Sequence, residues 1–222
     1  MIFMDTLRID KYWIKKIYIN GMKNNRLIDK LKNNNISINT GIIVYNPIEE
    51  AVILGTFKNT LDYCHFGGGK KKYETIYQSA IRELKEESLN CIDIKEDIIN
   101  SCPCIISYDI KVKKFCYIVF IVAMNVNINK LQNEFNVKKN NIENLEITNI
   151  VKVNLNDFYR LLDDSLNDYK IKNINFDKNR KEYKLYDNLK ELIVKDDSKK
   201  KIDIKEIFRY VKDKKKLNEN DK

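Results

Sequence analysis

The amino-acid sequence predicts an α/β fold, a mixture of helices and antiparallel strands that is flanked by helical extensions. Short apolar runs rich in β-branched and aromatic residues recur through the middle of the chain, as buried strands require. Between them, residues 75–89 repeat apolar side chains at helical spacing. With 43% hydrophobic and 33% charged residues among 222, the chain has the composition of a globular protein with a substantial core.

The elements before this helix are predicted from apolar runs and turn residues. Residues 1–39 are expected to be mostly helical. Strands are expected at residues 41–46 and 51–57, and the sequence NPIEE between them favours a hairpin, with antiparallel pairing. A short strand at residues 61–66 then leads into three successive glycines, Gly67–Gly69.

The helix at residues 75–89 is expected to bury Ile76, Ala80 and Leu84. A closing helix is expected at residues 155–163, with Asn154 as its N-cap. The last part of the chain favours two charged helices and a lysine-rich tail. Between the two central helices the sequence favours strands at residues 91–94, 102–110, 115–126 and 145–155.

The charge of the chain indicates a polyanionic partner. The formal net charge is +9 and the pI about 9.1, which favours binding to nucleic acid or phosphorylated ligands. Lysine-rich coding from an AT-rich genome is an alternative source of the same excess. No signal peptide is evident, and the apolar run at residues 115–126 is too short to span a bilayer, so we expect a cytoplasmic protein without a membrane partner.

Five cysteines occur without a C-x-x-C pair. Cys64 and His65, with Cys102 and Cys104, could in principle supply zinc ligands, but their spacing is not that of a known zinc site. Buried reduced thiols are the favoured interpretation.

Three carboxylates are expected on one face of the central helix. Glu83, Glu86 and Glu87 stand at i, i+3 and i+4, a spacing at which like charges repel. A divalent cation would offset this repulsion, and hard oxygen ligands favour Mg²⁺ or Mn²⁺. The alternative is a solvated face on which Arg82 and Lys85 balance the charge.

The glycines strengthen the metal hypothesis. Gly67–Gly69 lie shortly before the helix N-terminus, where free N–H groups and the helix dipole favour anions. Gly68 and Gly69 would also let the backbone approach a metal or a phosphate closely. A phosphate-binding loop joined to a carboxylate face suits metal-assisted hydrolysis of a phosphoanhydride.

These residues resemble the Nudix box, G-x5-E-x7-R-E-U-x-E-E-x-G-U, where U is a bulky aliphatic. The resemblance covers residues 38–165 and implies a Nudix domain there, which is an α/β/α sandwich around a mixed sheet. A helical extension at 1–37 and a basic helical extension at 166–222 would flank it. Within that family, the sequence resembles in particular the mRNA-decapping branch of large DNA viruses. The glycine and polar positions that match are Gly68, Glu74, Arg82, Glu83, Glu86 and Glu87.

The end of the box departs from the pattern. The family's last glycine falls on Leu89 and its last aliphatic on Asn90. We expect the left-handed turn to shift to Asn90, with Cys91 or Ile92 in the aliphatic role.

The resemblance implies roles for these residues. Glu83, Glu86 and Glu87 would ligate Mg²⁺ or Mn²⁺, with the backbone around Gly68 and Gly69 completing the site. Arg82 and Glu74 would pair and orient the carboxylates. Substrate phosphates would be bound by Gly67, Gly68, Gly69 and Lys70.

The general base varies in position within this superfamily. Glu146 is the first candidate and Glu143 the second, and a glutamate of the helix is a third possibility. An ordinary exposed glutamate is the alternative interpretation of Glu146.

The box predicts the chemistry and leaves the substrate open. The first hypothesis is cleavage of the mRNA 5′ cap, supported by the net charge and by lysines at 70–72, 111–114 and 212–216. The second is hydrolysis of a small nucleotide such as ADP-ribose, a dinucleoside polyphosphate or a damaged nucleotide. The third, a binding module without activity, is disfavoured because the box keeps all its glutamates. Candidate aromatics for stacking on a cap base are Tyr12, Trp13, Phe57 and Tyr63.

Overall fold

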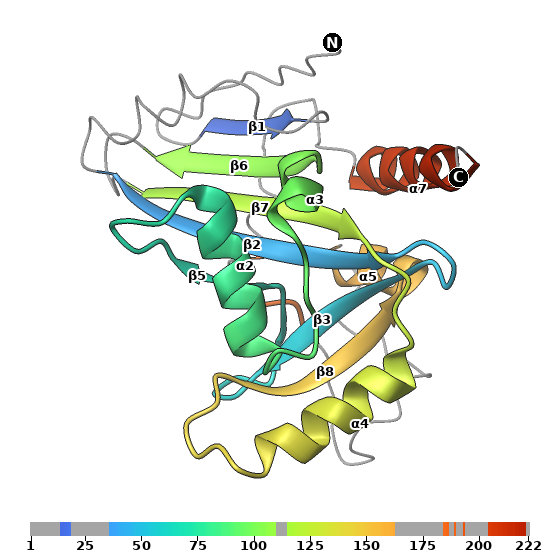
Figure 1. Ribbon diagram of the computed structural model, residues 1–222. Coiled ribbons are helices and arrows are strands. Elements are labelled where there is room, and N and C mark those ends of the chain that lie inside the picture. The colour runs from blue at the N-terminus through green and yellow to red at the C-terminus, as the bar shows by residue number, and fades with distance from the viewer. Residues whose placement is uncertain are drawn as a thin grey trace.

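The predicted fold class is confirmed by the computed structural model, which shows one mixed sheet with helices on both faces (Figure 1). The structure describes residues 14–18, 36–109, 115–162, 184–186, 189, 193 and 204–220, with the backbone alone for 14–18, 108–109 and 214–220. Expectations for residues outside these ranges, including most of the N-terminal extension and the first of the two C-terminal helices, lie outside the described part.

Eight strands form the sheet within the described ranges. Its main path runs β1-β6-β7-β2-β3-β4, while β5 pairs with β2 and β8 pairs with β3. The strands are β1 (Ile14–Tyr18), β2 (Ser37–Asn46), β3 (Ala51–Phe57), β4 (Tyr63–Cys64), β5 (Phe66–Gly69), β6 (Cys104–Asp109), β7 (Phe115–Ala123) and β8 (Ile147–Asn154).

The predicted hairpin is confirmed, because β2 and β3 pair antiparallel from Val44↔Ile53 to Asn46↔Ala51. The expected antiparallel pairing is wrong for the centre of the sheet. There β7 runs parallel to β2 from Ser37↔Phe115 to Tyr45↔Ala123. Parallel strands need a crossover connection that covers a face of the sheet, and the segment carrying the helices α2 (Ile76–Glu87) and α3 (Glu96–Asn100) lies in that connection.

One face of the sheet is covered by α2, α3 and α4 (Ile128–Lys139), as Figure 1 shows for α2 and α3 in front of the strands. The prediction that α2 buries Ile76, Ala80 and Leu84 is confirmed, and these side chains join the core cluster beneath the helix. The helix starts at a capping box in which Thr75 and Gln78 each bond the other's backbone N–H.

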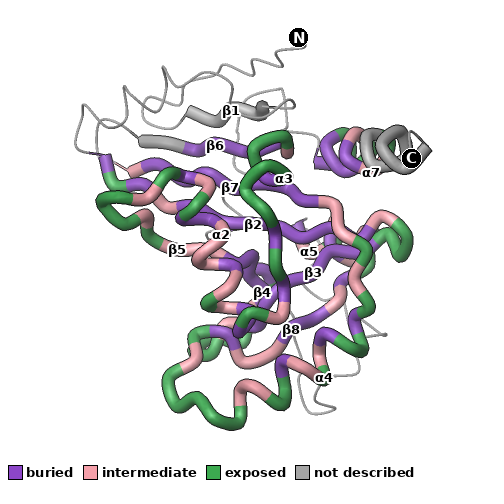
Figure 2. Tube along the Cα trace, in the orientation of Figure 1, coloured by how far each residue is buried: buried purple, intermediate pink, exposed green. Residues whose placement is uncertain are grey.

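The opposite face is covered by α5 (Leu155–Leu161) and α7 (Ile204–Asn220). The ring of Phe208 on α7 lies 4.9 Å from that of Tyr45 on β2 and 5.9 Å from that of Phe158 on α5. In Figure 2 the start of α7 is buried against the sheet. The basic C-terminal helix therefore contributes apolar side chains to the core as well as charge.

Some predicted elements differ from the structure. Residues 14–18 form a strand, where helix was expected, because β6 offers an edge whose backbone groups pair with them. Residues 91–94 form no strand, although Ile92 and Ile94 are buried. Residues 128–139 form a helix, α4, that was not expected. Its sequence is largely polar, and only Ile128, Leu131 and Phe135 reach the core. No helix of the described residues combines the length and apolarity that a membrane crossing needs.

The closing helix begins where it was expected. Asn154 is its N-cap, although its side chain makes no capping hydrogen bond, and α5 ends at Leu161.

Candidate functional site

The glycines lie directly beneath α2, on a strand rather than in a loop. Residues 67–69 belong to β5, which pairs with β2 through Asn39↔Gly69, Thr40↔Gly68 and Gly41↔Gly67. This pairing presents the β5 backbone to the carboxylates of the helix.

Two of these glycines contact glutamates of α2. The N–H of Gly67 donates to Oε2 of Glu87 at 2.7 Å. A Cβ at Gly68 would lie 2.6 Å from a carboxylate oxygen of Glu83, so no other residue fits there without moving Glu83. The glycines thus allow the close backbone approach that the sequence indicated, and in this structure the groups approached are the two carboxylates.

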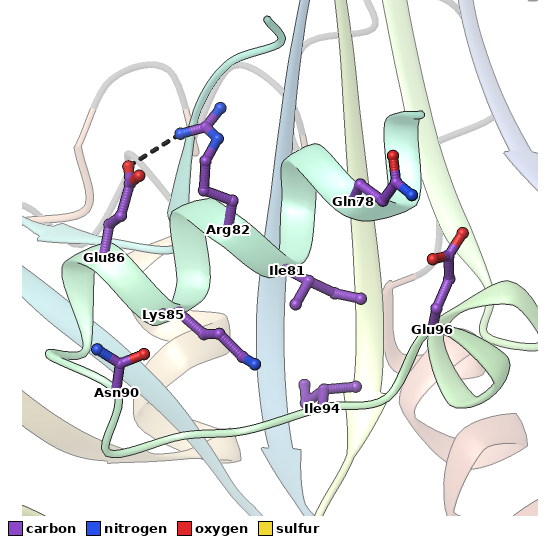
Figure 3. A pocket seen from close by; sticks show the side chains of 8 residues that line it. All are labelled: Gln78, Ile81, Arg82, Lys85, Glu86, Asn90, Ile94 and Glu96. Carbon is purple, nitrogen blue, oxygen red and sulfur yellow. Dashed lines mark hydrogen bonds and ion pairs between the residues drawn. The ribbon is translucent and has the colours of Figure 1, made fainter. Parts of the chain in front are cut away.

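Arg82 connects the glycine strand, the loop before the helix and the helix itself. Its guanidinium pairs with both oxygens of Glu74, at 2.5 Å and 3.1 Å. It also lies 2.7 Å from Glu83 and 2.9 Å from Glu86, and it donates to the carbonyl of Gly69 at 2.9 Å. Figure 3 marks the contact between Arg82 and Glu86 on the helix. The expected pair of Arg82 and Glu74 is therefore present.

Glu87 carries the most perturbed carboxyl group of the site. Burial raises its pKa to about 8, against the lowering effect of the Gly67 N–H, and the charges of Glu83 and Glu146 raise it further. Burial also raises the pKa of Glu83, which the hydrogen bond from Arg82 opposes. Within the described residues Glu87 has no cationic partner, so a positive charge beside it would favour its ionised form.

Glu146 lies at the edge of this group. It directly precedes β8, and its carbonyl accepts a hydrogen bond from the N–H of Lys58 at 2.7 Å. Its carboxylate is exposed, and its charge acts on the pKa values of both Glu83 and Glu87. Glu143 is exposed on the loop before it.

The donor chemistry of this site fits a divalent cation. Carboxylate oxygens of Glu83, Glu86 and Glu87 are the ligands that Mg²⁺ and Mn²⁺ prefer. In the described ranges, however, no three His, Cys, Asp or Glu side chains converge closely enough to enclose an ion. Arg82 holds Glu83 and Glu86 on one side of the helix, while Glu87 is held by Gly67. Loading the site would therefore reorient at least one of these carboxylates.

The residues expected to contact substrate are distributed differently. Lys70 is half-buried, and its N–H donates to the carbonyl of Ile38 at 2.9 Å. Tyr63 is only 1% exposed, so the expectation that it stacks on a base is wrong. Phe57 is half-buried, and its ring packs 5.2 Å from that of Tyr186. Tyr12 and Trp13 lie outside the described residues.

A buried histidine that the sequence did not single out for this site lies beside the glycines. Nε2 of His65 is 2.5 Å from the hydroxyl oxygen of Tyr117, and Nδ1 has no hydrogen-bond partner in the part of the chain that the structure describes. Burial lowers the pKa of His65 to about 4, so the ring is neutral at pH 7. Added Cβ atoms at Gly41 and Gly67 would lie 2.4 Å and 3.1 Å from this ring, so both glycines also make room for it. The only sequence signal was a single histidine next to the glycine run.

The helix exit also differs from the expectation. Leu89 and Asn90 both have a φ of 55°, so the left-handed turn includes Leu89 and is not shifted to Asn90 alone. The N–H groups of these two residues bond the carbonyls of Glu86 and Lys85, which is a Schellman motif. Leu89 occupies the position that usually holds glycine. Ile92, which is 2% exposed, takes the aliphatic role, whereas Cys91 is only half-buried.

Among the described residues, the cysteines belong to no cluster of side chains that could hold a metal ion. All five cysteines are free thiols. Cys64, Cys104 and Cys116 are buried as expected, whereas Cys91 and Cys102 are half-buried.

A shallow groove of about 430 Å³ borders the site on the outer side of α2 (Figure 3). Ile81 and Ile94 form its apolar part, and Arg82 and Glu86 connect it to the carboxylate group.

No protein-family model matches the sequence, and no curated protein does. The solved structures similar to this fold include Nudix hydrolases. A MutT/nudix family protein from Enterococcus faecalis is 13% identical, with 54% of this chain aligned to 44% of that chain at a TM-score of 0.37. The Ap4A hydrolase of C. elegans is 19% identical, with 56% of this chain aligned to 85% of that one at a TM-score of 0.38.

A third structure is a bifunctional NMN adenylyltransferase/ADP-ribose pyrophosphatase from Francisella tularensis, complexed with AMP and a manganese ion. It is 15% identical, and 59% of this chain aligns to 39% of that chain at a TM-score of 0.35. The aligned region thus spans less than half of the Enterococcus and Francisella chains.

Proposed function

We propose that this protein is a metal-dependent hydrolase of the Nudix type, which cleaves a phosphoanhydride bond in a nucleoside-diphosphate-linked substrate. One observation carries the proposal. The carboxylates of Glu83 and Glu87 on α2 pack directly on the backbone of Gly67 and Gly68, while Arg82 fixes the same helix to Glu74 in its leading loop. Gly68, Arg82, Glu83 and Glu87 occupy specified positions of the box, and Gly67 directly precedes its first glycine.

Glu83, Glu86 and Glu87, with the backbone at Gly68, would hold Mg²⁺ or Mn²⁺. The bound cation would neutralise charge on the phosphoanhydride and activate a water molecule for attack at phosphorus.

The chain itself supplies positioning. Arg82 orients Glu83 and Glu86 from one side, and its hydrogen bond to the Gly69 carbonyl fixes the position of the helix relative to β5. The Gly67 N–H fixes one oxygen of Glu87, which leaves the other oxygen of that carboxylate to face a ligand. Such supporting contacts limit the rotamers that the ligating carboxylates can adopt.

Glu146 is our proposed proton acceptor. Its exposed carboxylate directly precedes β8, and its charge raises the pKa of Glu83 and Glu87, which supports a position from which it would take a proton from an attacking water. Glu143 is the second candidate, and a helix glutamate is the third.

For the substrate we propose the 5′ cap of mRNA, with release of methylated GDP. The net charge of +9 and the exposed Lys71 and Lys72 next to the site support a polyanionic substrate. The alternative is a small nucleotide, such as ADP-ribose or a dinucleoside polyphosphate, for which the same carboxylates would serve.

A substrate panel tests this proposal. The purified protein would be incubated with Mg²⁺ or Mn²⁺ and cap-labelled RNA, free cap dinucleotide, ADP-ribose or diadenosine polyphosphate, and the products separated by chromatography. Release of methylated GDP from capped RNA, with little from free cap, is the expected result. Cleavage of the small nucleotides alone would replace the cap proposal with the alternative, and no turnover of any substrate would count against hydrolysis itself.

A further inference from the structure

We propose that the turn Lys70–Tyr73 binds a single-stranded polynucleotide, with one base stacked on Tyr73 and the backbone phosphates on the lysines. The inference rests on the proposed function in one respect, because the bound strand would be the part of the substrate that leaves after hydrolysis. The contacts that fix this turn, the exposure of its side chains and its position beside the carboxylates carry the proposal.

The turn is held in one conformation at both ends. At its start, the N–H of Lys70 donates to the carbonyl of Ile38 on β2 at 2.9 Å. At its end, Glu74 directly follows Tyr73 and is held by Arg82, and Oε2 of Glu74 accepts a hydrogen bond from the N–H of Lys71 across the turn at 2.9 Å. Side chains on this turn are therefore presented from a fixed backbone, which lowers the entropy lost on binding.

Tyr73 is the most exposed large hydrophobic side chain of the described residues, at 90%. Its ring is therefore open to solvent, and Nζ of Lys72 lies over one face, 5.5 Å from the ring centroid. An exposed aromatic ring beside a cation is the arrangement on which nucleic-acid bases stack without sequence preference.

The lysines place phosphates near the site. Nζ of Lys71 lies 3.8 Å from Oε1 of Glu86, and both side chains are more than half exposed, at 65% and 54%. The turn therefore borders the carboxylates on their solvent side. A strand that leaves the site in this direction would pass the lysine side chains and then the ring of Tyr73.

A polynucleotide fits these features better than a single nucleotide does. A small substrate engaged by the carboxylates has no need of a ring that points into solvent beyond Lys71. Consecutive phosphates and bases of a strand would use Lys71, Lys72 and Tyr73 together.

Binding measured without hydrolysis tests the proposal. The anisotropy of a labelled oligouridine would be recorded with the full chain in EDTA, for wild type, Tyr73→Ala and Tyr73→Phe. Tyr73→Ala is expected to weaken binding about tenfold, whereas Tyr73→Phe keeps the ring and restores affinity. Ile48→Ala is the matched control, because Ile48 is also exposed, at 72%, and lies on the β2–β3 turn.

The lysines are tested by salt dependence. Lys71→Ala/Lys72→Ala is expected to reduce the slope of log K against log salt by about 1.4, since each contact to a single strand contributes about 0.7. Lys95→Ala/Lys130→Ala removes the same charge from exposed lysines elsewhere and is expected to change the slope little. Equal effects of the two pairs would overturn the assignment to this turn.

The outcomes separate this inference from the proposed function. If nucleotides are hydrolysed but oligouridine binds equally to wild type and Tyr73→Ala, or does not bind at all, the inference fails and the hydrolase survives. If oligouridine binding depends on Tyr73 while no substrate is hydrolysed, the proposed function fails and the inference stands.

Discussion

Arg82 and Glu74 form a bidentate ion pair, with Nε of Arg82 2.5 Å from Oε1 of Glu74 and Nη2 3.1 Å from Oε2. The same guanidinium bonds Glu83, Glu86 and the carbonyl of Gly69. One side chain thus fixes the leading loop, the helix carboxylates and the glycine strand relative to one another. Several of its donors act at once, which the single ammonium of a lysine cannot reproduce.

Arg82→Lys should therefore lower turnover about 10- to 100-fold, as expected for loss of a group that orients metal ligands. The measurement is kcat with a saturating substrate from the panel, alongside the melting temperature. Lys85→Ala is the control, because Lys85 is on the same helix and pairs with the exposed Asp93 at 2.8 Å. Unchanged kcat in Arg82→Lys would show that the guanidinium of Arg82 does not position the carboxylates.

Glu87 should make the metal-free protein less stable as pH rises. Its folded pKa is raised to about 8 from the ordinary glutamate value of 4.5, so the folded state holds the proton more tightly than the unfolded state. The contribution of protonated Glu87 to the free energy of unfolding is fully present below the unfolded pKa and is lost as pH rises through the folded pKa. Urea unfolding in EDTA between these pH values should show stability falling in wild type and falling less in Glu87→Gln. Parallel pH profiles for the two proteins would contradict the raised pKa.

The left-handed conformation of Leu89 predicts an unusual order of substitutions. Leu89 is 8% exposed, so both Leu89→Ala and Leu89→Gly lose its packing. Its φ of 55° costs a non-glycine residue about 1 kcal/mol, so the glycine variant should be the more stable of the two by about that amount. At Ala80, inside α2, Ala80→Gly should instead lose about 1 kcal/mol. A Leu89→Ala variant as stable as Leu89→Gly would argue against the Schellman exit.

Tyr117→Phe should destabilise the protein by about 1–3 kcal/mol, because it removes the one hydrogen-bond partner that the buried ring of His65 has among the described residues. The free energy of unfolding would be measured by urea titration. Tyr73→Phe removes the same hydroxyl from an exposed ring and should change stability by less than about 0.5 kcal/mol. Equal effects of the two substitutions would mean that the hydroxyl of Tyr117 contributes nothing through His65.

The site was more predictable from the sequence than the sheet around it. The contacts of Gly67, Arg82 and Glu87 lie within one short segment, so their spacing along a helix and the segment before it nearly determines which residues are in contact. The pairing of β2 with β7 joins residues far apart in sequence, and no local pattern specifies its direction.

The missed features have physical reasons too. The helix α4 has a largely polar sequence, so its three buried residues give a weak periodic signal. The contact between His65 and Tyr117 depends on the packing of β5 against β7 through β2, which is a tertiary relationship. Leu89 adopts a glycine conformation because its side chain is buried, and burial outweighs the backbone preference.

The central claim is that Glu83, Glu86 and Glu87 act together as a metal-dependent hydrolytic site. The most direct test measures Mn²⁺ affinity and substrate turnover on the same preparations of wild type, Glu86→Gln and Glu87→Gln. We predict that both variants fold, bind Mn²⁺ more weakly and lose turnover by at least about 100-fold, as loss of metal-site residues should produce. Full turnover in both variants, with Mn²⁺ affinity unchanged, would contradict the account.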